Sequence, residues 1–409
     1  MSKFQDLNSL EFPSLHLPES DTEDPEVTVL VPSLDEQITV AQFCSWCHEG
    51  FQRAGVIGEI LLVDSSSDQT PEIAIAAGAR VLRVPRRGLG HAYRDAIPFV
   101  RGEYVILGDA DCTYDFREID GFIKELKHGA RFVMGSRFRG KMEKNAMPLH
   151  HKYFGSPLTT MLADLLFGLR ITDLHCGMRG LTTESLKSLD LKSDGWEYAS
   201  EMIVNAIRRD IPISEIPISF FGDMEGRESH VKRQGWTTPF KAGWKTVETL
   251  LTNAADFFLI PPGLSLSAIG SLMILLLSTG PLNWGDTKFT LNTMIVGLGI
   301  ASTGFICLAF GIFSRCFYDQ TGRKITKWKR ILPFNRSVLI SFIGFVLGIS
   351  LLLNFLFHWS NNARKVDITL ENTSHLAVVG ITIALASIST LITSLLINAL
   401  AKERETDAK

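Results

Sequence analysis

Acidic side chains recur where short apolar runs end in the first third of the 409-residue sequence: Glu36, Asp64, Asp109 and Asp111. Carboxylates that gather at one place repel each other and raise each other's pKa unless a cation neutralises them. Oxygen ligands suit Mg²⁺ or Mn²⁺, and a hard cation held by one or two carboxylates commonly binds substrate phosphates as well. Asp109 and Asp111 therefore predict a Mg²⁺ or Mn²⁺ site that also binds phosphate groups of a substrate. Helix capping is the alternative role for Asp64 and Asp111.

The elements that carry these carboxylates follow an alternating pattern. Short β-branched runs are separated by helix-like stretches, and the runs are Val27–Val31, Glu59–Val63, Arg80–Val84, Tyr104–Leu107 and Phe132–Met134. Such alternation predicts an α/β fold with a mostly parallel sheet and helices on both faces. In these sheets ligands bind beyond the carboxyl ends of the strands. The acidic residues lie at those ends, so their position favours a role in binding over capping.

The apolar residues are concentrated in the second part of the chain. The mean hydropathy is +0.14, yet residues 1–256 carry a formal net charge of −9 and residues 257–409 carry +6. Four uncharged stretches, about 262–280, 291–314, 337–359 and 376–401, are long enough to span a membrane as helices. We therefore expect an all-α transmembrane domain of four helices, rather than buried helices of a large soluble domain.

Basic residues near span ends predict the orientation. The connection between the second and third spans contains seven basic residues against one acidic residue, Asp319, which places it in the cytoplasm. An even number of spans then puts the catalytic domain and both termini in the cytoplasm. We expect a multi-pass protein of the cytoplasmic (inner) membrane. Homo-oligomer formation is left open.

Composition excludes several other classes. The chain is neither disordered overall nor a disulfide-rich secreted module, and its charge gives no support for nucleic-acid binding. Six scattered cysteines indicate a reducing compartment. Cys44 and Cys47 share one helical face with Val40 and Phe43, so we expect buried thiols. Residues 1–26, with seven acidic residues and one lysine, predict a disordered tail.

Several segments together resemble a known family: VLVPSLDE, LLVDSSSDQTPEIA, RRGLGHAYRDAI, YVILGDADCTYD, FVMGSRF, FGLRITDLHCGMRGL, GWEYASEMIVNAI, GRESHVKR and LIPPG. In this order they resemble the family 2 glycosyltransferases of GT-A fold, most closely the polyprenyl-phosphate glycosyltransferases of the dolichol-phosphate mannose synthase type. The resemblance implies a GT-A (Rossmann-like) catalytic domain over residues 27–235. A juxtamembrane linker (236–261), the four spans (262–401) and a cytoplasmic tail (402–409) follow.

The resemblance also implies a donor site. Pro32 and Glu36 resemble the nucleotide-binding loop, and Asp64 resembles the acidic contact to the base. Asp109 and Asp111 resemble the catalytic D-x-D pair that holds the metal and the donor diphosphate. The sequence leaves GDP and UDP open as the nucleotide.

An acceptor site is implied in the same way. Arg137 resembles the arginine that faces the phosphates and is a catalytic candidate, while Asp173 and Arg179 resemble the acceptor-side motif. Arg137, Lys232 and Arg233 are candidates for the acceptor phosphate, because guanidinium groups match phosphate in bidentate geometry. Contact with lipid headgroups is the alternative for Lys232 and Arg233.

Residues 147–170 are rich in large apolar side chains and begin with His150, His151 and Lys152. They predict an amphipathic segment at the membrane surface, with a core helix as the alternative.

These features together predict inverting transfer of one sugar from a GDP- or UDP-linked donor to polyprenyl (dolichyl or undecaprenyl) phosphate at the cytoplasmic face. Two alternatives are transfer to another lipid or a protein-linked acceptor, and a lipid-linked-sugar flippase or scaffold with a vestigial catalytic domain.

Overall fold

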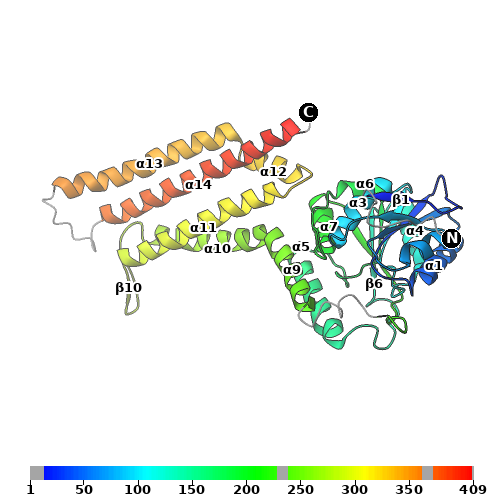
Figure 1. Cartoon of the computed structure of the whole chain (residues 1–409). Coiled ribbons are helices and arrows are strands. Elements are labelled where there is room, and N and C mark those ends of the chain that lie inside the picture. The colour runs from blue at the N-terminus through cyan, green and yellow to red at the C-terminus, as the bar shows by residue number, and fades with distance from the viewer. Residues whose placement is uncertain (1–12, 228–237, 362–371, 408–409) are drawn as a thin grey trace. The chain divides into compact units, whose positions relative to one another are not determined.

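The computed structural model describes residues 13–227, 238–361 and 372–407. The chain forms two compact units, Met1–Asn253 and Ala254–Lys409 (Figure 1).

Unit 1 is built on a mixed sheet. Among the described residues the sheet has eight strands in the order β1-β4-β3-β2-β5-β7-β6-β8. The strands are β1 (Ser14–His16), β2 (Val27–Ser33), β3 (Gly58–Asp64), β4 (Arg80–Arg83), β5 (Tyr104–Leu107), β6 (Phe132–Ser136), β7 (Arg179–Thr182) and β8 (Ile213–Pro217). Strands β4, β3, β2 and β5 run parallel to one another, and β7 lies antiparallel between β5 and β6. The five predicted runs are all strands.

Helices cover both faces of this sheet (Figure 1). The α-helices of unit 1 are α1 (Val40–Ala54), α2 (Thr70–Ala76), α3 (Leu89–Ala96), α4 (Ile119–Lys127), α5 (Ser156–Phe167), α6 (Thr183–Ser188), α7 (Tyr198–Arg208) and α9 (Thr238–Asn253). Short helices η2 (Ile97–Phe99), η3 (Phe116–Glu118) and the π-helical η4 (His151–Gly155) accompany them. Gly55 ends α1 in the left-handed conformation that favours glycine.

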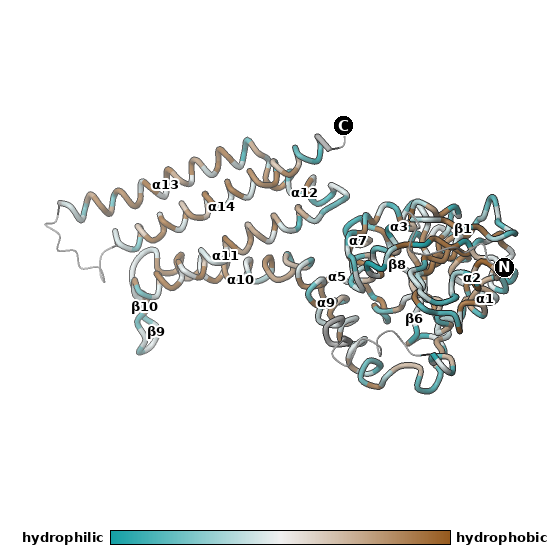
Figure 2. The backbone as a smooth tube through the Cα atoms, in the orientation of Figure 1, coloured by the Kyte–Doolittle hydropathy of each residue, from teal (hydrophilic) through white to brown (hydrophobic). Residues whose placement is uncertain are grey.

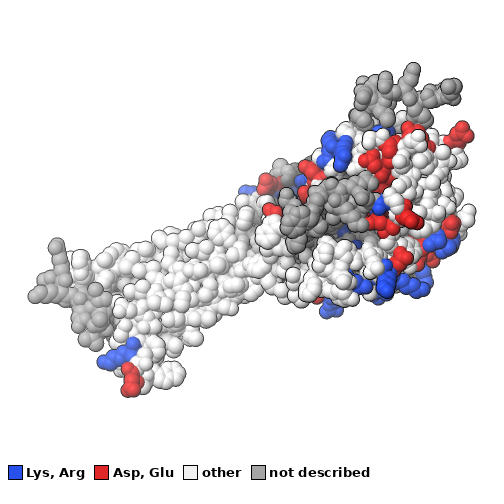
Figure 3. Space-filling view, turned by 60° about the horizontal axis from the view of Figure 1, so that its bottom comes forward, with Lys and Arg blue, Asp and Glu red and all other residues white. Residues whose placement is uncertain are grey.

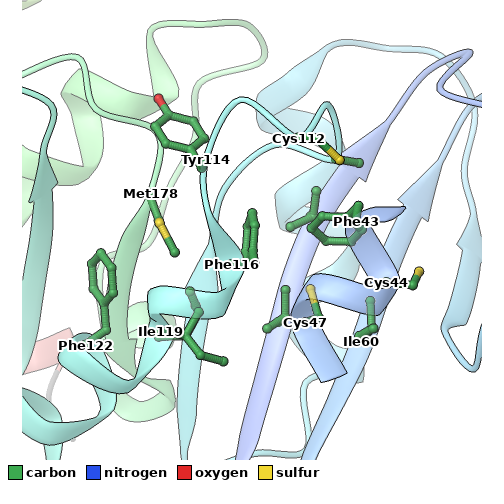
Figure 4. Packing of buried hydrophobic residues seen from close by; sticks show 14 of the residues in the cluster. Phe43, Cys44, Cys47, Ile60, Cys112, Tyr114, Phe116, Ile119, Phe122 and Met178 are labelled. Carbon is green, nitrogen blue, oxygen red and sulfur yellow. The ribbon is translucent and has the colours of Figure 1, made fainter. Parts of the chain in front are cut away.

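The core between α1, α4 and the sheet holds the strand ends in place (Figure 4). The rings of Phe43 and Phe116 meet edge to face with centroids 4.8 Å apart. Cys44 and Cys47 are fully buried in the same cluster, which confirms the prediction of buried thiols. Because Phe116 lies five residues after Asp111, this packing fixes the loop that follows β5.

The prediction of a disordered tail over residues 1–26 is wrong for its second half. Ser14–His16 forms β1, which pairs antiparallel with β4 at the edge of the sheet. Asp21 forms an ion pair with Arg101 at 2.8 Å. Hydrogen bonds to the edge of β4 and the ion pair with Arg101 compensate for the conformational entropy that the segment loses on ordering. The composition of the segment shows neither interaction.

Unit 2 consists mainly of four long helices. They are α10 (Ala255–Leu276), α11 (Leu291–Phe317), α13 (Phe334–Asn361) and α14 (Asn372–Asp407), joined by the hairpin β9 (Leu282–Trp284) and β10 (Thr287–Phe289) and by α12 (Arg323–Ile331). All four are long and apolar enough to cross a membrane. Hydrophobic residues dominate along them (Figure 2), and their surface is uncharged over most of the face seen in Figure 3.

The four predicted spans therefore correspond to four helices. Helices α11, α13 and α14 extend beyond the predicted bounds, whereas α10 starts before residue 262 and ends at Leu276, short of residue 280. The predicted linker 236–261 is mostly helical, because α9 occupies Thr238–Asn253 and α10 begins at Ala255. Pro261 and Pro262 lie inside α10.

Candidate active site

A cavity of about 380 Å³ lies at the carboxyl ends of β2, β3 and β5. Strand β2 stands between the other two, so the strand order reverses there, which is where open α/β sheets bind ligands. Five residues singled out from the sequence line this cavity: Pro32, Glu36, Asp109, Asp111 and Arg137.

Asp109 and Asp111 present an acidic pair to the cavity. Asp109 accepts no hydrogen bond from any residue that the structure describes, whereas Asp111 Oδ1 accepts from the backbone nitrogen of Thr113 at 3.0 Å and from its hydroxyl at 2.6 Å. Burial, and then the charge of Asp111, raise the pKa of Asp109, while Arg227 opposes the increase. Burial also raises the pKa of Asp111. The carboxylate pair therefore fits a divalent cation.

Arg227 neutralises this acidic region from within the protein. Its Nε and Nη2 donate to the two carboxylate oxygens of Glu36 at 2.8 and 2.6 Å. Nη2 also lies 3.2 Å from Asp111 Oδ2, and Nη1 donates to Asp223 at 2.6 Å. One guanidinium thus bridges three carboxylates at the cavity wall.

Arg137 is held by Asp173, so two predicted residues form one unit. Arg137 Nε and Nη2 donate to the Asp173 carboxylate at 2.7 and 2.8 Å, and the guanidinium lies 5.2 Å from the centre of the Phe220 ring. Glu215 accepts from the backbone nitrogen of Asp173 at 3.1 Å. No hydrogen bond links Nη1 of Arg137 to a described residue, so this nitrogen is available to an anion in the cavity.

Asp64 lies beneath the cavity rather than in its lining. It is fully buried and accepts hydrogen bonds from Arg83, from Ser33 at 2.7 Å and from Ser66 at 2.5 Å. These bonds tie the ends of β2 and β3 together. Its neighbour Ser65 lines the cavity.

Arg179 is also outside the lining. Its buried guanidinium donates to the backbone carbonyls of Cys176 at 2.9 Å and Ala199 at 2.7 Å, so it joins the segment after Asp173 to the start of α7. Lys232 and Arg233 lie outside the described residues.

Sequence reasoning assigned no role to Arg86 and Trp196, which line the cavity. Arg86 forms no ion pair with any described residue. Gly88, at φ +118°, lies so close to the Asp194 carbonyl that a Cβ would clash with it, and the Gly90 nitrogen donates to that carbonyl at 3.0 Å. The glycine spacing in RRGLG was the available signal for this close approach of the two loops that carry Arg86 and Trp196.

Segment 147–170, predicted to be amphipathic, buries mainly small and polar residues and exposes most of its large apolar ones. Helix α5 buries small and polar residues, among them Ser156, Thr159 and Ala163. Most large apolar side chains of the segment face outward, although Leu166 is buried. Six of them are 61–74% exposed: Leu149 before η4, Tyr153 and Phe154 in η4, and Leu158, Met161 and Leu165 in α5. A helix that packed in the core would bury these residues instead.

Comparisons with known proteins agree with this architecture. Residues 56–190 match the model for glycosyl transferase family 2, and residues 312–401 match the glycosyltransferase family 2 C-terminal transmembrane region. The low-salt glycan biosynthesis hexosyltransferase Agl6 of Haloferax volcanii is 36% identical over 296 residues, which cover 72% of this chain and 70% of that protein. The dolichyl-phosphate hexose transferase of the same organism is 30% identical over 40% of this chain and 69% of that protein.

Among solved structures, one match is the structure of glucosyl-3-phosphoglycerate synthase from Mycobacterium tuberculosis. It shares 19% identity at a TM-score of 0.45, covering 56% of this chain and 80% of that one.

The protein is a glycosyltransferase with a GT-A catalytic unit and a multi-pass membrane region. The chain belongs to glycosyltransferase family 2.

Proposed function

We propose that this glycosyltransferase moves a single hexose or related sugar from a GDP- or UDP-linked donor to polyprenyl phosphate, with inversion at the anomeric carbon. The observation that supports this most is the joint lining of one cavity by Asp109, Asp111 and Arg137 at the carboxyl ends of the strands. The 30% identical dolichyl-phosphate hexose transferase supports a lipid phosphate as the acceptor.

We infer that the donor diphosphate binds next to Asp109 and Asp111. These two carboxylates would hold Mg²⁺ or Mn²⁺, which stabilises the charge of a departing nucleoside diphosphate. Among the described residues no cluster of three His, Cys, Asp or Glu side chains could hold a metal ion. Two carboxylates suffice when substrate phosphates complete the coordination shell.

The acceptor needs positioning more than deprotonation. A phosphate oxygen of the lipid is already ionised at neutral pH. It forms the new bond to the anomeric carbon while the bond to the donor diphosphate breaks. Arg137 offers Nη1, and Arg86 a side chain without an ion partner among the described residues, so both can attract phosphate in the cavity. Lys232 and Arg233 remain candidates for the acceptor phosphate.

The membrane supplies the acceptor. The exposed apolar residues of η4 and α5 are proposed to lie in the lipid interface. The basic connection between α11 and α13 favours an orientation with the catalytic unit and both termini in the cytoplasm.

Incubation of membranes that contain the full-length protein with radiolabelled GDP- and UDP-sugars and polyprenyl phosphate tests the function. We expect a labelled lipid from one donor, dependent on Mg²⁺ or Mn²⁺. Mild acid should release the sugar, because a sugar phosphodiester is acid-labile. An acid-stable product would indicate transfer to another class of acceptor.

Nucleotide binding tests the donor site separately. Thermal unfolding with GDP or UDP plus Mn²⁺ should show a higher Tm with one nucleotide, because ligands that bind only the folded state stabilise it. Failure of every nucleotide to bind would instead support a scaffold or flippase with a vestigial catalytic unit.

A further inference from the structure

Helix α12, Arg323–Ile331, differs from every other described helix of unit 2 in its charge. Within nine residues it carries five basic side chains and no acidic one: Arg323, Lys324, Lys327, Lys329 and Arg330. Neither the cavity nor the proposed reaction uses this helix.

One face of α12 is anchored in the bundle. Ile325 is buried and packs in a cluster with Ile312, Cys316 and Ile397, which come from α11 and α14, and Trp328 lies against the same cluster. The position of the helix is thus fixed by apolar contacts on this face.

A buried carboxylate also fixes where α12 begins. Asp319 is fully buried and accepts hydrogen bonds from the backbone nitrogens of Lys324 at 2.7 Å and Ile325 at 3.1 Å. These are donors of the first helical turn, which otherwise lack partners. Asp319 therefore caps the start of the helix.

The outward face is a basic stripe. Arg323, Lys327 and Arg330 are spaced three and four residues apart, so they share one side of the helix, and all three are exposed. Within the described residues no carboxylate forms an ion pair with Lys327 or Arg330, whereas Lys329, on another side of the helix, lies 3.8 Å from Glu405.

The chain connections keep this stripe at the membrane surface. Only Leu332 and Pro333 separate α12 from the membrane-spanning helix α13, which begins at Phe334. Three Cα–Cα steps span at most about 11 Å. The helix therefore stays within or beside the headgroup layer, where lipid phosphates are the abundant anions.

We propose that α12 is a binding site for acidic phospholipids, in which Arg323, Lys327 and Arg330 contact the headgroup phosphates. Ile331, more than half exposed beside the stripe, contacts the upper part of the acyl chains. Helix α12 would then pack against α11 and α14 with its apolar face and contact lipid phosphates with its basic face.

Native mass spectrometry of the full-length protein in nonionic detergent tests this site. The protein is titrated with phosphatidylglycerol and with phosphatidylcholine of the same acyl chains. We expect the wild type to prefer phosphatidylglycerol, and the preference to fall as NaCl is raised. Each neutralised basic residue should cost about fivefold in affinity, so R323Q/K327Q/R330Q should bind phosphatidylglycerol about 100-fold more weakly.

Two control variants distinguish the effect of the α12 charges from an effect of misfolding or of total charge. K124Q/K187Q/K288Q removes three charges from exposed positions outside α12 and should leave the lipid preference unchanged, as should the charge-conserving R323K/R330K. Equal affinity of the wild type for both lipids would overturn the site, and so would an unchanged preference in the α12 triple variant. Strong competition by inorganic phosphate at the same concentration as the lipid would also overturn the proposal, because such competition would indicate a site for a soluble anion.

Discussion

Charged side chains of the cavity pair with one another before any ligand binds. Arg227 contacts Glu36 and Asp111, and Arg137 contacts Asp173. A cation that binds at Asp111 therefore meets a carboxylate already partly neutralised by an arginine. This arrangement keeps an acidic cavity stable while the donor is absent.

Replacing Arg227 by methionine should show how much the arginine stabilises these carboxylates. The buried pair loses one partner, so the free energy of unfolding should fall by about 3–5 kcal/mol in the absence of divalent cations. Mn²⁺ should recover part of the loss, so it should raise the Tm of R227M more than that of the wild type. Thermal unfolding with and without MnCl₂ measures both effects.

Arg53 offers a matched control for that variant. It forms an exposed i,i+4 pair with Glu49 at 3.7 Å, and R53M should change stability by less than about 1 kcal/mol. Equal Tm values and equal Mn²⁺ responses in R227M and the wild type would contradict the neutralising role of Arg227.

His175 predicts a pH effect on stability. Its Nε2 lies 2.8 Å from the Thr159 hydroxyl, and burial, followed by the charge of Arg137, lowers its pKa from 6.5 to about 4. Between these values the unfolded chain binds more protons than the folded protein. The contribution of His175, up to about 3 kcal/mol, is complete above pH 6.5 and is lost as the pH falls towards 4.

The variant His175→Gln should therefore show a flatter loss of Tm between pH 6.5 and 4.5 than the wild type. Parallel Tm profiles for the two proteins over this range would show that His175 titrates normally in the folded state.

The sequence predicted part of the site at residue level. Glu36, Asp109 and Asp111 follow strands that the β-branched pattern identifies, and Pro32 lies near the end of one of them. Their meeting at one cavity could therefore be foreseen. The pairing of Glu36 with Arg227 could not, because the two residues are 191 positions apart and no local pattern links them.

At the scale of elements, β-branched runs located β2 to β6, but β1, β7 and β8 were not foreseen. Strand β7 has the sequence Arg-Gly-Leu-Thr and forms only between β5 and β6. Its pairing depends on tertiary neighbours rather than on its own propensity.

The outward apolar face of α5 should serve the acceptor and not the fold. Leu158→Glu with Leu165→Glu places charge on side chains more than 60% exposed, so the Tm in detergent should change little. In membranes, turnover with polyprenyl phosphate should fall at least about tenfold, because the face can no longer enter the lipid interface. Donor binding should be unchanged.

Measuring nucleotide affinity, Tm and turnover on the same preparation checks this expectation, and Leu158→Met with Leu165→Met is the control. Full turnover in the glutamate variant would exclude a membrane role for α5. A large fall in Tm in detergent would show instead that the face is buried in the folded protein.

Helix packing in unit 2 depends on close backbone approach. A Cβ on Gly270 of α10 would clash with backbone atoms of Gly297 and Ala301 in α11, whereas Gly299 has open space around it. Gly270→Val should therefore separate the two helices and lower the Tm in detergent by several degrees, and Gly299→Val should not. Similar Tm values for the two variants would contradict this packing.

At the scale of the whole molecule, the near-neutral net charge conceals two different units. The acidic residues gather in the catalytic unit, and the membrane unit is basic and largely apolar. This division follows from composition alone, because spans are recognised by length and hydropathy. The ion pairs and hydrogen bonds of the cavity residues, by contrast, could be identified only from the three-dimensional structure.

The most direct test of the central claim compares sugar transfer by the wild type and Asp111→Asn in the same membranes. We measure the initial rate of labelled polyprenyl-phosphate sugar formation at saturating Mn²⁺, with expression matched. The wild type should form the acid-labile product. Asp111→Asn should lose at least about 100-fold in rate, since a preorganised charge at the departing diphosphate is removed. A wild-type rate in Asp111→Asn, or no labelled lipid from any donor with the wild type, would contradict the proposed reaction.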